Sequence, residues 1–133
     1  MSRKYIDDLG VKFEDTPQGY NTDSKKETRW GKWEEERQTY GFDERETWCL
    51  DLNLALWMYE RLMMYLEIAW IDLEYHTFEY NGETLTERQC IDKMLEGFKL
   101  LILDHGVVID EEKSAKVDDA FKILGICHHA LWW

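Results

Sequence analysis

The chain of 133 residues fits one domain of ordinary size, and 44% of its residues are hydrophobic, which is too many for a wholly disordered chain. It contains 28 acidic and 16 basic residues and has a formal net charge of −12. Such a surface repels phosphate backbones and anionic lipids, which argues against direct binding to nucleic acid or to a membrane. A partner with a basic surface is easier to accommodate, although an acidic surface also keeps a protein soluble.

Three cysteines are widely spaced and form no CxxC motif: Cys49, Cys90 and Cys127. Each lies in an apolar helical setting, so we expect reduced core residues of a cytoplasmic protein. Residues 1–10 are polar and carry no recognisable secretory signal. Charged residues interrupt the apolar stretch 52–73, which therefore predicts a buried helix and no membrane span.

Residues 1–42 differ from the rest of the chain, because their apolar residues are few and scattered and their net charge is only −1. Together with the polar run Asn21–Thr28, this composition predicts a loosely structured arm, with a short strand or turn around Val11–Phe13. Trp30 and Trp33 lie in this polar arm and need a surface to pack against. We expect that surface to be the protein's own helices, with a partner as the alternative.

The clearest helical signals begin at Asp43, which forms a capping-box pattern with Glu46. We expect a long helix from there to about Tyr75, and we expect Trp48 to lie in its core. Its polar residues recur every seven positions and form one stripe, which we interpret as solvated: Asn53, Glu60, Glu67 and Glu74. A helix with one narrow polar stripe is typical of the central element of a helical bundle.

Two further helices are predicted after a turn at Asn81-Gly82. A second capping box, Thr86–Gln89, begins a helix that ends near Gly106. An acidic linker, Asp110–Glu112, then leads to a third helix from about Lys113. Its apolar face consists of Val117, Ala120, Phe121, Leu124, Cys127 and Leu131.

These patterns predict an all-α fold, a small helical bundle of three main helices with a loosely structured N-terminal arm. We divide the chain into an irregular arm, residues 1–42, and a helical domain, residues 43–133. The helical domain carries a net charge of −11. Because it contains both capping boxes and all three apolar stripes, we expect it to fold without residues 1–29.

Several short motifs occur in an order that resembles a family of uncharacterised proteins from bacteriophages and prophages. Tyr40-Gly41-Phe42-Asp43 is followed by Trp48-x-Leu50-Asp51, as in the aromatic turn and W-x-L-D helix of that family. The later motifs are Leu85-Thr86-Glu87, Met94-x-x-Gly97-Phe98 and Leu131-Trp132. The resemblance covers about residues 40–133, and Tyr75-His76-Thr77-Phe78 replaces a His-Gly-Tyr-Pro-like turn. It implies a phage origin and an all-helical fold, and it supplies no activity or site residue.

No constellation of residues predicts catalysis, a cofactor or a metal. Asp51 lies one turn after Trp48, and we expect it to be partly buried and bound by backbone, Arg or Trp donors. Asp72 and His76 are four residues apart but lack a second ligand pair. Adjacent side chains in Cys127-His128-His129 point about 100° apart on a helix and do not converge on one ion. We therefore predict a protein that is not an enzyme.

The favoured function is that of a small acidic phage-type protein in the cytoplasm of a bacterial host, where it inhibits a nucleic-acid-handling defence or transcription machine. The partner would be a host protein with a basic surface, and no direct contact with nucleic acid or membrane is expected. The candidate contact residues are Asp110, Glu111, Glu112, Asp118, Asp119, Trp30, Trp33, Trp132 and Trp133. Two alternatives stay open: a protein that sequesters a small molecule or nucleotide, and a virion or assembly component that self-associates. The sequence leaves the oligomeric state open.

Overall fold

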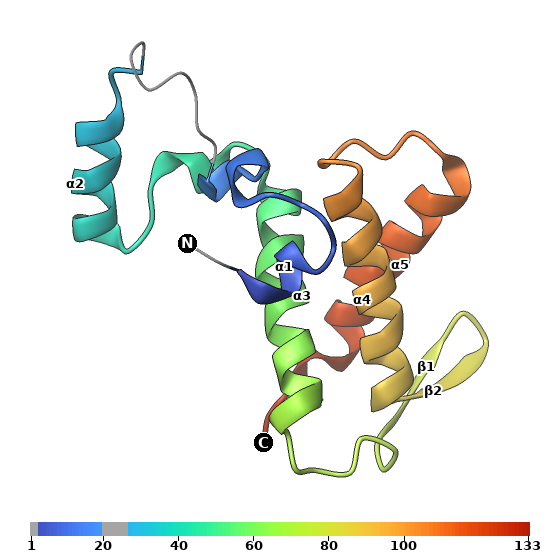
Figure 1. Ribbon diagram of the computed structural model, residues 1–133. Coiled ribbons are helices and arrows are strands. Elements are labelled where there is room, and N and C mark those ends of the chain that lie inside the picture. Colours follow the sequence, from blue (N-terminus) through green and yellow to red (C-terminus); the bar gives the residue numbers. More distant parts are fainter. Residues whose placement is uncertain (1–2, 20–26) are drawn as a thin grey trace.

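Three main helices pack together in the computed structural model, which describes residues 3–19 and 27–133 (Figure 1). They are α3 (Leu50–Ile68), α4 (Glu87–Leu103) and α5 (Glu111–Cys127). Helix α4 packs against both α3 and α5, so it is the middle element of the bundle. The predicted all-α fold class is confirmed. Most of the polar run Asn21–Thr28 lies outside the described residues.

Shorter elements surround these helices. Ahead of α3 lie α1 (Lys4–Asp7), 3-10 helices Phe13–Asp15 and Pro17–Gly19, α2 (Trp30–Tyr40) and the 3-10 helix Glu44–Thr47. An antiparallel hairpin of β1 (Thr77–Tyr80) and β2 (Glu83–Thr86) connects α3 to α4, and the 3-10 helix His128–Ala130 follows α5. No helix in the described part of the chain is long and apolar enough to cross a membrane.

The short helix α1 belongs to the hydrophobic core, although the sequence suggested a loose arm here. Tyr5 and Ile6 are buried in the same apolar cluster as α3. Arg3 forms an ion pair with Glu60, and the Tyr5 hydroxyl donates a hydrogen bond to Glu67 at 2.8 Å. The interpretation of Glu60 as a solvated residue is therefore wrong, because its partly buried carboxylate binds Arg3 at the start of α1. Glu67 is exposed, as expected, and also accepts the hydrogen bond from α1.

Helix α3 begins later and ends earlier than the interval predicted from Asp43 to Tyr75. Asp43 caps the 3-10 helix Glu44–Thr47 instead, and its carboxylate accepts from the backbone N–H of Arg45 at 3.0 Å. The Arg45 guanidinium binds the same buried carboxylate through Nε at 2.9 Å and Nη2 at 2.8 Å. This local pair closes a tight turn in place of the α-helical capping box that was expected with Glu46.

Other residues near the start of α3 also differ from expectation. Trp48, Cys49 and Asp51 are exposed. Asn53 is buried, and its amide donates to the Cys49 carbonyl at 3.1 Å, so it is not a solvated residue. Glu74 lies beyond the end of α3. Trp48 packs edge-on against an aromatic ring of α2 and lies outside the central core.

The predicted signals around α4 and the hairpin are confirmed. The Gln89 N–H donates to the Thr86 hydroxyl at 3.2 Å, and the Thr86 N–H donates to the Gln89 side chain at 2.9 Å, which completes the capping box. Asn81 and Gly82 adopt positive φ angles of 50° and 76°, as the tight turn of a hairpin requires. The Asp110 carboxylate accepts from the Lys113 N–H at 2.9 Å. The expected acidic linker is therefore the N-cap and first turn of α5.

Helices α4 and α5 approach each other closely at Gly97. A Cβ atom at this position would lie 2.5 Å from both the Ala120 Cβ and the Lys116 carbonyl oxygen. We expect Gly97→Ala to destabilise the protein by about 1–3 kcal/mol, because the two helices would have to move apart. Chemical denaturation measures this loss. The matched control is Gly125→Ala on α5, which meets open space and should be neutral or stabilising by up to about 1 kcal/mol.

The burial of α1 makes residues 3–11 part of the fold, contrary to the expectation that residues 1–29 are dispensable. Ile6 is fully buried, so Ile6→Ala should lower the free energy of unfolding by about 2–5 kcal/mol. The control is Lys12→Ala, a change at an exposed position nearby. Equal stability of the two variants in chemical denaturation would contradict the docking of α1 on α3.

Candidate partner-binding surface

The five acidic residues predicted as partner contacts are the N-cap of α5 and four residues of that helix, and the structure divides them into two groups. Asp110 caps α5, and Asp119 accepts a hydrogen bond from the Tyr80 hydroxyl of the hairpin. Those two carboxylates therefore have a role inside the fold. The others are exposed and form no ion pair with any described residue: Glu111, Glu112 and Asp118.

The contact between Tyr80 and Asp119 holds the hairpin against α5. The hydrogen bond to Asp119, partial burial and the negative charge of Asp118 raise the pKa of Tyr80 to about 12. The phenol therefore stays protonated and keeps donating to Asp119 at any physiological pH. Neutralising Asp119 would consequently change the fold as well as the surface charge.

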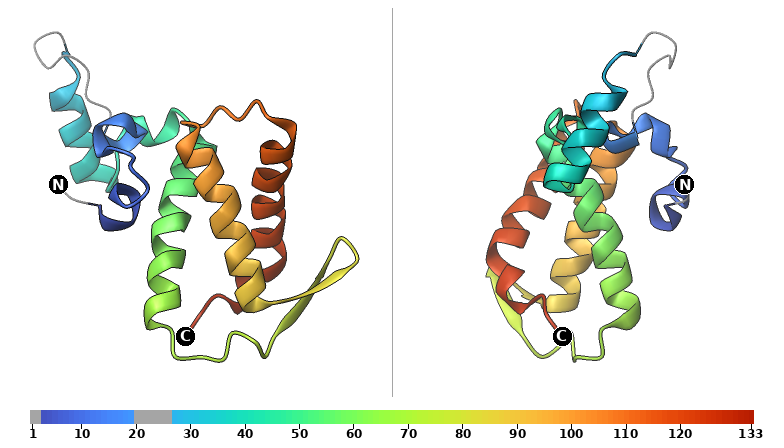
Figure 2. Two further views of the ribbon diagram at one scale, coloured as in Figure 1. Left: turned by 45° about the vertical axis from the view of Figure 1, so that its right-hand side comes forward. Right: turned by 90° about the vertical axis from the view of Figure 1, so that its left-hand side faces the viewer.

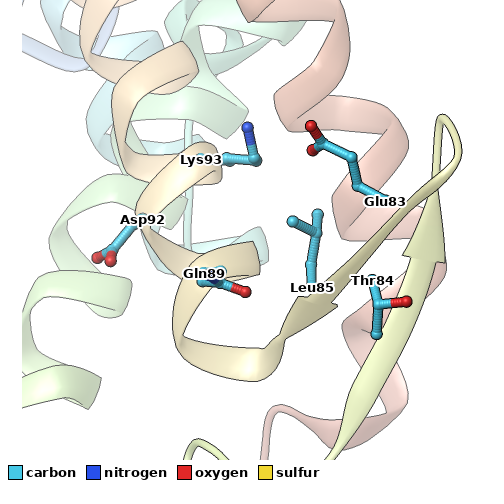
Figure 3. A pocket seen from close by; sticks show the side chains of 6 residues that line it. All are labelled: Glu83, Thr84, Leu85, Gln89, Asp92 and Lys93. Atoms are coloured by element: carbon cyan, nitrogen blue, oxygen red, sulfur yellow. The ribbon is translucent and has the colours of Figure 1, made fainter.

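A shallow hollow of about 570 Å³ lies between the hairpin and α4 (Figure 3). Lys93 and Glu83 point into the space above Leu85, whereas Asp92 points away from it (Figure 3). One lysine beside a glutamate gives little attraction for a phosphate-bearing ligand. This hollow therefore gives no support to a nucleotide-binding function.

Trp33 is fully buried and cannot contact a partner, which corrects its place among the candidate contacts. Its indole N–H donates to Glu44 at 2.8 Å, and its ring packs edge-on against Trp30 and Trp48 at centroid distances of 5.1 and 5.9 Å. The Arg45 guanidinium lies 4.5 Å from its centroid. These contacts attach α2 to the 3-10 helix before α3, so the protein's own chain covers Trp33. Trp30 is half-buried in the same cluster.

Trp132 and Trp133 are exposed, by 72% and 50%. They lie beside the C-terminal end of α3, where the Tyr65 hydroxyl donates to the Trp132 carbonyl at 3.2 Å. Of the four candidate tryptophans, these two offer the largest accessible rings.

A second apolar surface runs along α3, and the sequence interpretation missed it by treating the helix as the central element of the bundle. We call it the outer row, and it consists of Leu50, Leu54, Trp57, Arg61, Met64 and Ile68. Its five apolar members are between 40% and 67% exposed. The alternating spacing of four and three residues was visible in the sequence and is the spacing of a coiled-coil seam.

Three groups with raised pKa values lie inside the protein: Glu87, Cys90 and Cys127. Glu87 is fully buried, and burial raises its pKa. One of its carboxyl oxygens is 3.4 Å from the Tyr65 hydroxyl, and the other has no hydrogen-bond partner among the described residues. Burial also raises the pKa of Cys90, and that of Cys127 to about 12, so both thiols stay protonated. Their expected places in the core are confirmed, whereas Cys49 is exposed.

No protein-family model, curated protein or solved structure matches the chain. The resemblance of residues 40–133 to a phage family therefore stays a prediction. Within residues 3–19 and 27–133, no three His, Cys, Asp or Glu side chains are grouped so as to hold a metal ion.

The buried Glu87 predicts a pH dependence of stability. Its pKa is higher in the folded than in the unfolded protein, so folding loses stability as the pH rises from about 4.3 through the folded value. We expect Glu87→Gln to be more stable than the wild type at neutral pH, by on the order of 1 kcal/mol, because the amide can be buried without the cost of ionisation. Denaturation at several pH values measures this. The difference should vanish at acidic pH.

The control for this measurement is Glu74→Gln, which changes the same group at an exposed position. It should leave the pH profile of the wild type unaltered. A Glu87→Gln protein that is less stable than the wild type at neutral pH would show that the ionised carboxylate contributes to the fold.

Proposed function

We propose that this protein acts by binding a basic host protein, as an inhibitor of a nucleic-acid-handling machine in the cytoplasm of a bacterial host. The observation that carries the proposal is the group of exposed carboxylates at Glu111, Glu112 and Asp118. None of them forms an ion pair with a described residue, although Glu112 interacts electrostatically with Lys116. They belong to a part of the chain, residues 43–133, with a net charge of −11. Exposed charge of one sign attracts a surface of the other and speeds association.

The position of these carboxylates has a structural cause as well. Glu111 and Glu112 occupy the first turn of α5, where the helix dipole favours negative charge by about 0.3–1 kcal/mol each. This role needs one or two acids at the helix start and does not require Asp118, which lies two turns further on. Asp118 therefore extends the negative surface beyond what capping needs.

A mechanism through contact, without catalysis, is supported by where the chemically distinctive groups lie. Glu87 and Cys127 have raised pKa values, and both are fully buried. A substrate in solution has no access to them. The exposed surface instead offers carboxylates and aromatic rings, which are groups that bind protein partners.

The test compares two variants of equal net charge. In the first, Glu111→Gln, Glu112→Gln and Asp118→Asn remove the exposed acids of α5 and leave Asp110 and Asp119 intact. In the second, Glu14→Gln, Asp15→Asn and Glu35→Gln remove three exposed acids from the N-terminal part. We expect the first variant to capture fewer nucleic-acid-binding proteins from a bacterial lysate and to associate more slowly with the captured protein. The control variant should behave like the wild type.

The salt dependence of the association rate supplies a second measurement. Exposed charges are screened beyond a Debye length of about 8 Å at physiological ionic strength, so the wild-type rate should fall as salt rises. An association rate that is independent of salt, or equal loss in both variants, would contradict a contact through α5. Trp132 and Trp133 would then be the contacts to substitute.

A further inference from the structure

The outer row of α3 is a second apolar face on a helix whose first face already packs in the core. Leu52, Leu56 and Leu62 are buried on the inner side of α3. The outer row continues through the whole helix of 19 residues, which is about five turns. Scattered exposed apolar residues are ordinary, whereas a continuous row at coiled-coil spacing is typical of a helix that packs against another helix.

The outer row is symmetric about residue 59. Leu50 and Ile68 lie nine positions to either side of it, and Leu54 and Met64 lie five positions to either side. Trp57 and Arg61 lie two positions to either side of residue 59. A row with this symmetry is complementary to itself when two copies of α3 run antiparallel about a two-fold axis. Each layer of such a pair then joins a residue to its mirror position in the other copy.

The positive charge of Arg61 also distinguishes a parallel from an antiparallel pair of α3 helices. A parallel pair would place two Arg61 side chains against each other, which repels. An antiparallel pair places each Arg61 against the indole of Trp57 from the other copy. The Arg61 guanidinium already lies 4.1 Å from the centroid of Trp57 in its own chain, and it forms no ion pair with a described residue. Stacking on a second indole would shield it without a carboxylate.

The ends of α3 widen this surface. A standard interface buries about 800 Å² on each partner, more than one row of half-exposed side chains provides. Trp132 and Trp133 lie beside the C-terminal end of α3, while Tyr40 and Phe42 are exposed in the segment that leads to its N-terminal end. Figure 2 shows α2 at the level of the N-terminal half of α3 and the chain's C-terminus at the opposite end of that helix. In an antiparallel pair the two aromatic ends come together.

We infer that the outer row of α3 binds the same row of a second copy of this chain, with the two helices antiparallel about a two-fold axis at the level of Tyr59. The protein is then a closed dimer with two equivalent copies of every other surface. This inference does not rest on the proposed function, because the exposed acids of α5 lie on the other side of α4 from α3 (Figure 2).

The test uses a pair of charge substitutions that can be complementary only in the antiparallel dimer. Leu54→Lys and Met64→Glu each place a charge in an apolar layer, and each variant alone should raise the dimer dissociation constant about 100-fold or more. An equimolar mixture should form a heterodimer, because Lys at 54 of one copy then faces Glu at 64 of the other. Analytical ultracentrifugation of the wild type, of each variant and of the mixture measures the masses.

Both substituted positions are partly exposed, and circular dichroism should show the wild-type helical signal for each variant. The control is Lys99→Glu at an exposed position of α4, which should dimerise like the wild type. A wild type that is monomeric at every concentration up to its solubility limit would overturn the inference. A mixture that stays monomeric while the wild type dimerises would also overturn it, because the layers would then pair differently.

Discussion

The contact of α4 with α5 at Gly97 determines where the other parts of the molecule can lie. Because Gly97 has no side chain, α5 approaches so closely that the Ala120 methyl group and the Lys116 carbonyl occupy the space of a Cβ atom. This fixed distance lets Tyr80 reach Asp119 and hold the hairpin against α5. Helix α4 also packs against α3, and α3 binds the α1 region through Glu60 and Glu67.

The sequence predicted those parts of the fold whose signals are local. The capping box of Thr86 with Gln89 and the turn at Asn81-Gly82 depend on neighbouring residues alone, and both form as predicted. The prediction at Asp43 was wrong, because Arg45 competes for the same carboxylate and favours a tight turn. The seven-residue spacing predicted one solvated stripe on α3, but Asn53 is buried and Glu74 lies beyond the helix. Periodicity carries no information on what covers the face of Glu60 and Glu67. Only the folded structure shows that α1 does.

The candidate contact residues also depend on tertiary contacts that local sequence signals do not predict. Five acids that are close together in the sequence were predicted to form one patch. In the structure, Asp110 caps α5 and Asp119 binds Tyr80 of the hairpin. Trp33 and Trp132 were both predicted as partner contacts because both are large aromatic residues. Trp33 is fully buried, whereas Trp132 is 72% exposed. Burial of a single large ring depends on contacts between distant segments, which one sequence does not specify. The spacing of the outer row, by contrast, was present in the sequence and was overlooked because α3 was interpreted as the central element of the bundle.

The two proposed contacts of this protein differ in the force that drives them. Two copies of a chain with a net charge of −12 repel each other, so a dimer needs an interface that excludes acidic groups. The outer row meets this condition, because it contains five apolar residues, one arginine and no acid. Added salt screens the repulsion between copies and weakens the attraction between the α5 carboxylates and a basic partner. Dimerisation and partner binding therefore respond to salt in opposite directions, and a dimer presents its acidic surfaces twice to any partner that can reach both.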